Sequence, residues 1–212
     1  MKRVIVTAVR SVMRQIARVL DTLSGGRITP DAVTWFGFLM HLPIGYLIAT
    51  GHMLWGAALL IVFGLFDALD GELARLQKRE SDRGGFLDAS TDRFKEVLLY
   101  TAVAYLLART VDPRLAAIAV AACGASICVS FVKSKGETII ASRGQKLSYP
   151  QLNRMFGGGL FSFEVRILVL IVGLVVGSLL AIDGVVWASV VVVVGAALTA
   201  LQRLVVISRS IR

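Results

Sequence analysis

The sequence DALDGELARLQKRESDRGGFLDASTD, residues 67–92, contains five aspartates, three glycines and three arginines between strongly apolar segments. Asp82 falls in the polar middle of this run. The other four aspartates adjoin apolar sequence: Asp67, Asp70, Asp88 and Asp92. A carboxylate beside apolar sequence is costly unless it is paired or hydrated. Four of them close together therefore indicate a bound divalent cation.

The composition of the whole chain is that of a membrane protein. Of its 212 residues, 56% are hydrophobic and 17% are charged, and the mean hydropathy is +0.75. These values are too apolar for an ordinary soluble domain. Six apolar segments are near or above the length of about 20 residues that a spanning helix requires. They are residues 31–51, 54–76, 86–108, 112–141, 163–182 and 184–207. The sequence therefore predicts an all-α, polytopic membrane protein with six transmembrane helices.

The distribution of positive charge predicts the orientation. Of the 23 Lys and Arg residues, only Arg109 and Arg114 fall on the outer side if the N-terminus is cytoplasmic. This asymmetry follows the positive-inside rule. We expect a multi-pass protein of the inner (cytoplasmic) cell membrane, with both termini and the active site on the cytoplasmic side. Topology and anionic membrane lipids explain the net charge of +9. No nucleic-acid motif accompanies this charge, so no nucleic acid partner is predicted.

The N-terminal residues 2–22 have an apolar and a basic face at helical spacing. The apolar face includes Val9, Val12 and Ile16, and the basic face Arg10, Arg14 and Arg18. This pattern predicts an interfacial amphipathic helix, with a short helix packed on the bundle as the alternative. We therefore divide the chain into a juxtamembrane amphipathic segment, 1–26, and a six-helix transmembrane catalytic domain, 27–212. The basic, glycine-containing loop 142–162 is typical of a flexible lid.

The spacing of the aspartates predicts two facing pairs. Asp67 and Asp70 are three residues apart and Asp88 and Asp92 four apart, so each pair projects from one face of a helix. A tight hairpin between the two helices can bring both pairs around one or two metal ions. Hard oxygen ligands favour magnesium, manganese or calcium.

Small residues and an arginine lie beside this predicted metal site. Gly71 and Ala74 leave the face of Asp67 without bulk, and Arg75 is suited to a bidentate phosphate contact. Metal, arginine and a cleft of small residues together indicate a pyrophosphate site. In the alternative interpretation, the aspartates only pair with nearby basic residues. These are Arg75, Lys78, Arg79, Arg83, Arg93 and Lys95. A cation transporter is a further alternative, although the outer halves of the apolar segments contain almost no ionisable groups.

The run resembles a known family. Its pattern D-x2-D-G-x2-A-R-x8-G-x3-D-x3-D is similar to that of the CDP-alcohol phosphotransferases. The positions that match are Asp67, Asp70, Gly71, Ala74, Arg75, Gly84, Asp88 and Asp92. The six-helix arrangement extends the resemblance over essentially the whole chain. The resemblance implies an enzyme of phospholipid biosynthesis, a transferase that moves the substituted phosphate of a CDP-linked lipid, CDP-diacylglycerol, to an alcohol and releases CMP. It also implies a homodimer.

The resemblance also implies a role for each residue of the motif. Asp67, Asp70 and Asp88 would hold a metal that bridges the pyrophosphate, and Asp92 would be the base, also near a second ion. We therefore expect two ions of Mg²⁺ or Mn²⁺. The CDP group would lie against Asp31, Thr34, Gly71, Ala74, Arg75 and Gly84.

A second basic group bears on the acceptor. Lys133, Arg166 and Arg203 are predicted on the cytoplasmic side, where they could bind the phosphate of a soluble phosphorylated alcohol. Alternatively, they interact with lipid phosphate as ordinary positive-inside residues. The stretches SFVKSKGE (130–137) and LQRL (201–204) are similar to phosphatidylinositol-phosphate synthases of actinobacterial type, which favours inositol phosphate. A paired-arginine pattern of those enzymes is reduced here to Arg166, so glycerol 3-phosphate, giving phosphatidylglycerophosphate, is the runner-up.

One further pattern concerns packing. Gly173 and Gly177 are four residues apart in the fifth apolar segment and permit close approach of another helix. Both a dimer contact and internal packing fit this spacing.

Overall fold

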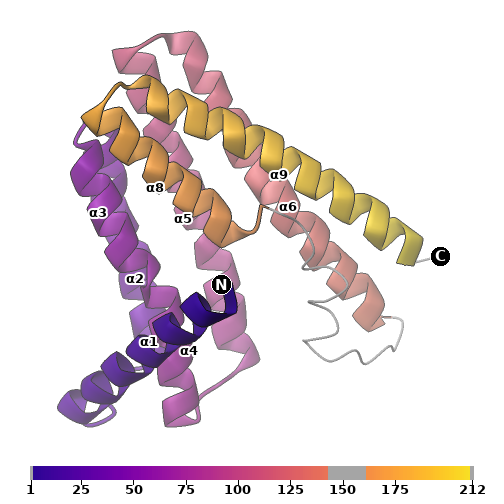
Figure 1. Cartoon of the computed structure of the whole chain (residues 1–212). Coiled ribbons are helices and arrows are strands. Elements are labelled where there is room, and N and C mark those ends of the chain that lie inside the picture. The colour runs from indigo at the N-terminus through magenta and orange to yellow at the C-terminus, as the bar shows by residue number, and fades with distance from the viewer. Residues whose placement is uncertain (1, 143–160, 211–212) are drawn as a thin grey trace.

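A computed structural model describes residues 2–142 and 161–210, with side chains described from Val9 onward. The regular elements in these two stretches are all helices (Figure 1), which confirms the all-α prediction. They are α1 (Lys2–Ser24), α2 (Pro30–Ala49), α3 (Met53–Gly64), α4 (Phe66–Gln77), α5 (Asp82–Thr110), the short 3₁₀ helix η1 (Pro113–Leu115), α6 (Ala116–Ser142), α8 (Phe163–Leu179) and α9 (Asp183–Ser210). Most of the predicted lid lies outside the described residues.

Four stretches of helix among the described residues are long and apolar enough to cross a membrane. They are Pro30–Ala49, Met53–Gln77, Pro113–Ser142 and Asp183–Ser210. The two remaining predicted segments are also helical. However, α8 has only 17 residues, and the first half of α5 carries several charged side chains. The count of six crossings therefore stays a prediction.

The predicted segment 54–76 falls within the stretch Met53–Gln77, which is long and apolar enough to span, but the helix is interrupted at Leu65 between α3 and α4. Gly64 precedes the break, and glycine has low helix propensity. Aromatic rings surround it: the Phe63 and Phe66 rings are 5.0 Å apart, and Phe36 packs against both. The break starts a new helix at Phe66, so Asp67 lies in the first turn of α4. The positive end of the helix dipole favours a carboxylate there.

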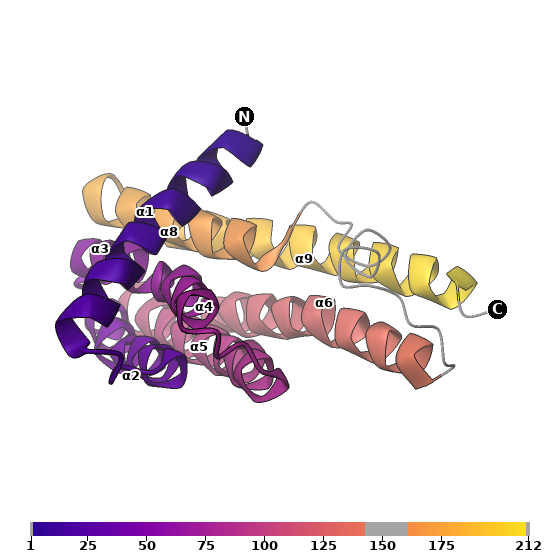
Figure 2. The same ribbon diagram turned by 90° about the horizontal axis from the view of Figure 1, so that it is seen from below.

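Helix α1 packs across α4 at one end of the bundle (Figures 1 and 2). Met13 and Ala17 are buried against the apolar residues of α2 and α4, including Leu69 and Leu73. Only part of the apolar face predicted for α1 is therefore buried. Val9 lies beside the buried pair, whereas Val12 and Ile16 are exposed. Contact of α1 with the bundle is thus part of the fold, and its interfacial location stays a prediction.

The other helices pack around two apolar clusters. One joins α2, α3, α5 and α8 through Ile48, Leu60, Val103 and Leu174. The other joins α5, α6 and α9, and α6 and α9 lie side by side in both views (Figures 1 and 2).

Helices α8 and α9 approach each other closely at the two glycines. A Cβ atom at Gly173 would meet Ala188 and lie 3.1 Å from the carbonyl oxygen of Gly184. One at Gly177 would lie 2.7 Å from a methyl group of Val185. The glycine pair therefore serves packing within the chain.

Candidate functional site

A cavity of about 630 Å³ lies between α1, α2, α4, α5 and the start of α8. Its walls contain every residue that the sequence assigned to the metal or to the CDP group. These are Asp31, Thr34, Asp67, Asp70, Gly71, Ala74, Arg75, Gly84, Asp88 and Asp92. Residues of α2, α4 and α5 thus form one site. The three residues assigned to the acceptor are not among the lining residues of this cavity.

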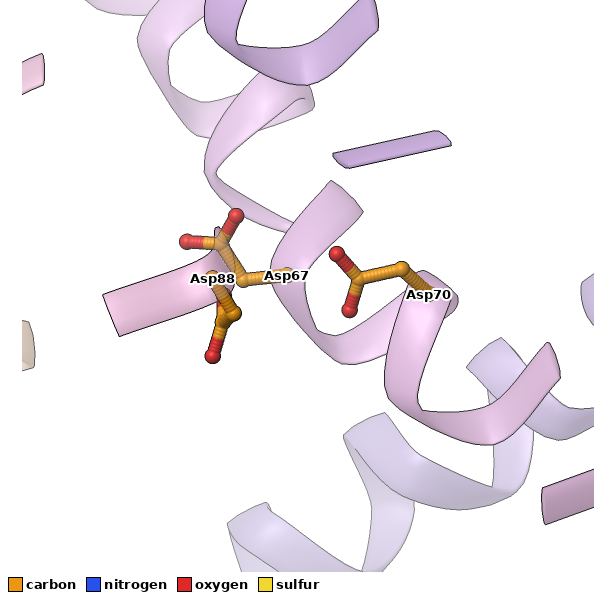
Figure 3. Close-up of side chains that lie close together, drawn as sticks. All are labelled: Asp67, Asp70 and Asp88. Atoms are coloured by element: carbon orange, nitrogen blue, oxygen red, sulfur yellow. The ribbon is translucent and has the colours of Figure 1, made fainter. Parts of the chain in front are cut away.

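Three carboxylates form the centre of the site. Each of Asp67, Asp70 and Asp88 offers an oxygen that lies within 4.8 Å of the others (Figure 3). Thr34 on α2 donates a hydrogen bond to Oδ2 of Asp70 (2.5 Å), which fixes that side chain. Asp88 Oδ1 is buried and has no hydrogen-bond partner among the described residues. A buried carboxylate oxygen without a partner is costly, and a divalent cation would supply one. The donor set therefore fits magnesium or manganese.

Local sequence places these carboxylates. Thr29 caps α2, with its side chain accepting from the backbone N–H of Ala32, and Pro30 begins the helix. Lys78 ends α4 in the left-handed conformation (φ 54°), and Ser81 caps α5 by accepting from the N–H of Gly84 (3.1 Å). Asp82, from the polar middle of the motif, therefore occupies the first turn of α5, where it is exposed.

Asp92 is held by two cations. Lys95 contacts Asp92 Oδ1 at 3.2 Å and Asp67 Oδ1 at 2.5 Å, and Arg93 lies 3.5 Å from Asp92 Oδ2. Sequence reasoning included Lys95 only among the basic residues that could neutralise the aspartates. Its spacing of three residues from Asp92 was the available signal. The contact with Asp67, 28 residues away, depends on the meeting of α4 and α5.

Arg75 does not pair with the aspartates. Its guanidinium group donates to Glu72 (2.9 Å), which also accepts from Arg14 of α1 (3.2 Å). A Cβ atom at Gly71 would make an ordinary van der Waals contact with the Arg75 guanidinium, 3.5 Å away, so Gly71 lies beside this group. Half of the Arg75 side chain remains exposed, and it borders the cavity. Glu72 thus orients Arg75 without burying it.

Glu96 organises the basic residues behind the cavity. It is fully buried and accepts from Arg166 through Nε (3.1 Å) and an NH2 group (2.9 Å), and from Arg93 (2.6 Å). Arg166 also donates to the carbonyl of Phe161 (2.9 Å), so its guanidinium is engaged on both sides. The sequence did not indicate Glu96, since its partner lies 70 residues away.

The remaining predicted acceptor residues lie on α6 and α9. Arg203 donates to the carbonyl of Val129 (2.9 Å) and is close enough to Arg166 for mutual repulsion. Lys133 lies 3.7 Å from Glu137, whose charge also acts on Arg203. The three basic residues thus belong to one region.

The fold and this cluster of carboxylates can be compared with known proteins. The family model described as CDP-alcohol phosphatidyltransferase matches residues 27–194. The chain belongs to this family. It is therefore a transferase, and the family assignment confirms the resemblance drawn from the aspartate motif. The residues that the motif predicted for the metal and the CDP group thus line one cavity of a protein of the CDP-alcohol phosphatidyltransferase family.

Named relatives lie within this family. The phosphatidylinositol phosphate synthase of Corynebacterium glutamicum is 30% identical over 205 residues, which covers 94% of this chain and 85% of the relative. The enzyme of the same name from Cutibacterium acnes is 33% identical over 138 residues, 61% of this chain and 67% of the relative.

Solved structures show the same fold. Mycobacterium tuberculosis phosphatidylinositol phosphate synthase with CDP-DAG bound has a TM-score of 0.78 at 23% identity, covering 93% of this chain and 94% of that one. The same enzyme was also solved in complex with manganese and citrate, with a TM-score of 0.78 at 23% identity, covering 92% of this chain and 88% of that one.

Proposed function

We propose that this protein transfers the phosphatidyl group of CDP-diacylglycerol to the hydroxyl group of a phosphorylated polyol and releases CMP. Inositol phosphate is the favoured acceptor. The observation that carries the proposal is the meeting of Asp67, Asp70 and Asp88 in one cavity with the small residues and arginine of the same motif. A relative solved with CDP-DAG bound, and another structure solved with manganese, support the substrate and the metal.

The carboxylates take different roles. Asp67, Asp70 and Asp88 would hold Mg²⁺ or Mn²⁺, which when bound neutralises pyrophosphate charge and makes CMP a better leaving group. Asp92 accepts the proton of the attacking hydroxyl group, so that the oxygen can attack the phosphorus of the lipid. Lys95 and Arg93 hold Asp92 in place. Transfer then occurs directly between the two substrates, and the cavity aligns them.

The nucleotide side of the cavity is assigned to the motif's other residues. Gly71, Ala74 and Gly84 leave space for CDP, and Arg75 binds a phosphate oxygen. Thr34 contributes by fixing Asp70. Asp31 lies 3.8 Å from Arg83 and close to Gly84, at the same wall. The diacyl chains remain in the bilayer.

The acceptor phosphate is assigned to the basic region of Lys133, Arg166 and Arg203. Phe163 connects this region to the cavity: it lines the cavity, and the Arg166 guanidinium lies 6.0 Å from its ring centroid. Arg166 is largely engaged by Glu96, so Lys133 and Arg203 would supply most of the contact with phosphate. The names of the relatives favour inositol phosphate. Glycerol 3-phosphate is the second candidate, because the same basic region could bind its phosphate group.

The membrane arrangement completes the proposal. We propose six crossings in the domain 27–212, a juxtamembrane segment 1–26 on the cytoplasmic side, and a homodimer in the inner membrane. The charge asymmetry supports this orientation. In Figure 1, α1 and the α4–α5 turn lie together at the lower end of the bundle, which is the end we propose to be cytoplasmic.

The test is CMP release by purified protein. Protein in detergent or nanodiscs receives CDP-diacylglycerol, Mg²⁺ or Mn²⁺ and one acceptor at a time. We expect the fastest CMP release with inositol phosphate, slower release with glycerol 3-phosphate, and none after chelation of the metal. Absence of CMP release with every phosphorylated and unphosphorylated polyol would refute the proposed function.

A matched pair of variants separates the site from general charge effects. Asp88→Asn should abolish CMP release, because it removes a metal ligand with a buried oxygen. Asp82→Asn makes the same chemical change at an exposed position in the first turn of the same helix and should leave the rate unchanged. Equal rates for the two variants would remove Asp88 from the site.

A further inference from the structure

Lys95 is a buried cation within the carboxylate cluster. Only 1% of the residue is exposed. Lysine is almost never buried to this extent unless its charge has a partner. Its Nζ atom lies 2.5 Å from Asp67 Oδ1 and 3.2 Å from Asp92 Oδ1. The ammonium group thus connects the first aspartate of the motif, on α4, with the last, on α5.

Removal of these contacts would leave Lys95 in an unfavourable state. A buried ammonium group without its counter-ion has lost its hydration with no compensating contact, so breaking a buried pair in this way is strongly destabilising. A second cation therefore does not readily displace the Lys95 ammonium group from Asp67 and Asp92. Any divalent ion between these two carboxylates would also be repelled by the ammonium group at contact distance.

The three-carboxylate group leaves Lys95 undisturbed. Asp67, Asp70 and Asp88 offer oxygens within 4.8 Å of one another, and Asp92 is not part of that group. A carboxylate has two oxygens that can accept different partners. Asp67 can thus contact Lys95 through Oδ1 and a metal ion through Oδ2. One divalent ion and the ammonium group therefore fit together, whereas a second ion that uses Asp67 and Asp92 would compete with Lys95.

We propose that Lys95 takes the place of a second metal ion. In this arrangement, which rests on the proposed function, the chain binds one divalent cation on Asp67, Asp70 and Asp88. The Lys95 ammonium group is the fixed positive charge between Asp67 and Asp92. It is a positioning residue: it holds the Asp92 carboxylate beside the metal, where Asp92 accepts the proton of the acceptor. This replaces the two ions expected from the family resemblance.

The number of Mn²⁺ ions bound per chain tests this proposal without any substrate. Purified protein in nanodiscs is titrated with Mn²⁺, and bound ions are counted by electron paramagnetic resonance and calorimetry. The wild-type protein should bind one ion. Lys95→Met should bind two, and the second should show the spectral broadening of a nearby manganese pair. Asp92→Asn introduced into Lys95→Met should return the count to one.

Controls separate the charge of Lys95 from loss of structure. Lys135→Met makes the same change at an exposed lysine of α6 and should leave the count at one. Circular dichroism and size exclusion establish whether each variant is folded. If Lys95→Met does not fold, Lys95→Gln keeps a hydrogen-bond donor, removes the charge and should also bind two ions.

The remaining outcomes overturn the proposal. Two ions in the wild-type protein, or one ion in the folded Lys95 variants, would show that Lys95 does not replace a metal. In either case, CMP release by the wild-type protein would leave the proposed function intact. No bound Mn²⁺ together with no CMP release would refute the proposed function itself.

Discussion

Substitution of Glu96 by glutamine should destabilise the protein strongly. Glu96 is fully buried and is the shared acceptor of Arg93 and Arg166, and Arg166 itself is only 1% exposed. Glutamine has nearly the same shape, but it removes the negative charge. Its amide also places an NH2 donor against one of the two arginine donors. Arg166 then becomes a buried cation without a counter-ion.

The expected magnitude follows from burial. Loss of one partner of a buried ion pair costs about 3–5 kcal/mol. The loss of the Arg93–Glu96 pair adds less to this destabilisation, because 27% of the Arg93 side chain is exposed and solvent screens its charge. At roughly 2–4 °C per kcal/mol for a protein of this size, the apparent Tm should fall by about 6–20 °C. The measurement is thermal unfolding in detergent, followed by circular dichroism at a fixed scan rate.

Two further variants decide whether this reasoning is right. Glu80→Gln changes an exposed glutamate and should shift the unfolding free energy by less than about 0.5 kcal/mol. The double variant Glu96→Met, Arg166→Met leaves no unpaired charge at position 166 and should recover most of the lost stability. Equal Tm values for Glu96→Gln and Glu80→Gln would refute the reasoning.

Three other predictions concern the site and the packing. Asp92→Asn should abolish CMP release while CDP-diacylglycerol binding, measured by calorimetry, is largely retained; equal loss of binding would make Asp92 a ligand and not the base. Arg203→Ala should raise the KM for the phosphorylated acceptor far more than the KM for CDP-diacylglycerol in steady-state assays, and an unchanged acceptor KM would exclude Arg203 from the acceptor site. Gly173→Leu should lower stability by about 1–3 kcal/mol in the same unfolding assay, because the carbonyl of Gly184 and the Ala188 side chain fill the space; an unchanged Tm would contradict the close α8–α9 contact.

The sequence predicted the centre of the site well because its chemistry is local. The spacing of Asp67, Asp70 and Asp88 on two neighbouring helices almost requires that they meet when the connection is short. The structure places them together and in one cavity with the glycine, alanine and arginine positions of the motif. Burial of several carboxylates also has few physical solutions, which made a cation site the natural expectation.

Features that depend on distant partners could not be predicted in this way. Burial of Arg166 against Glu96 joins residues 70 positions apart, so the sequence indicated Arg166 only as one of the basic residues that could bind the acceptor phosphate. The break at Leu65 was also missed, because the apolar pattern continues through it without interruption. Similarly, the apolar pattern of α1 did not show that Met13 and Ala17 would be buried while Val12 and Ile16 stay exposed.

The sequence by itself determined the helical class and the family, and it predicted the residues around the pyrophosphate, because helix periodicity and the spacing of the aspartate motif depend on residues that are close in the sequence. Tertiary structure alone decided that Gly173 and Gly177 pack against α9 and that Glu96 engages Arg166. It also placed Lys95 between Asp67 and Asp92. The physical reason is that a buried charge takes its partner from whichever helix lies against it, and the sequence does not state which helices meet.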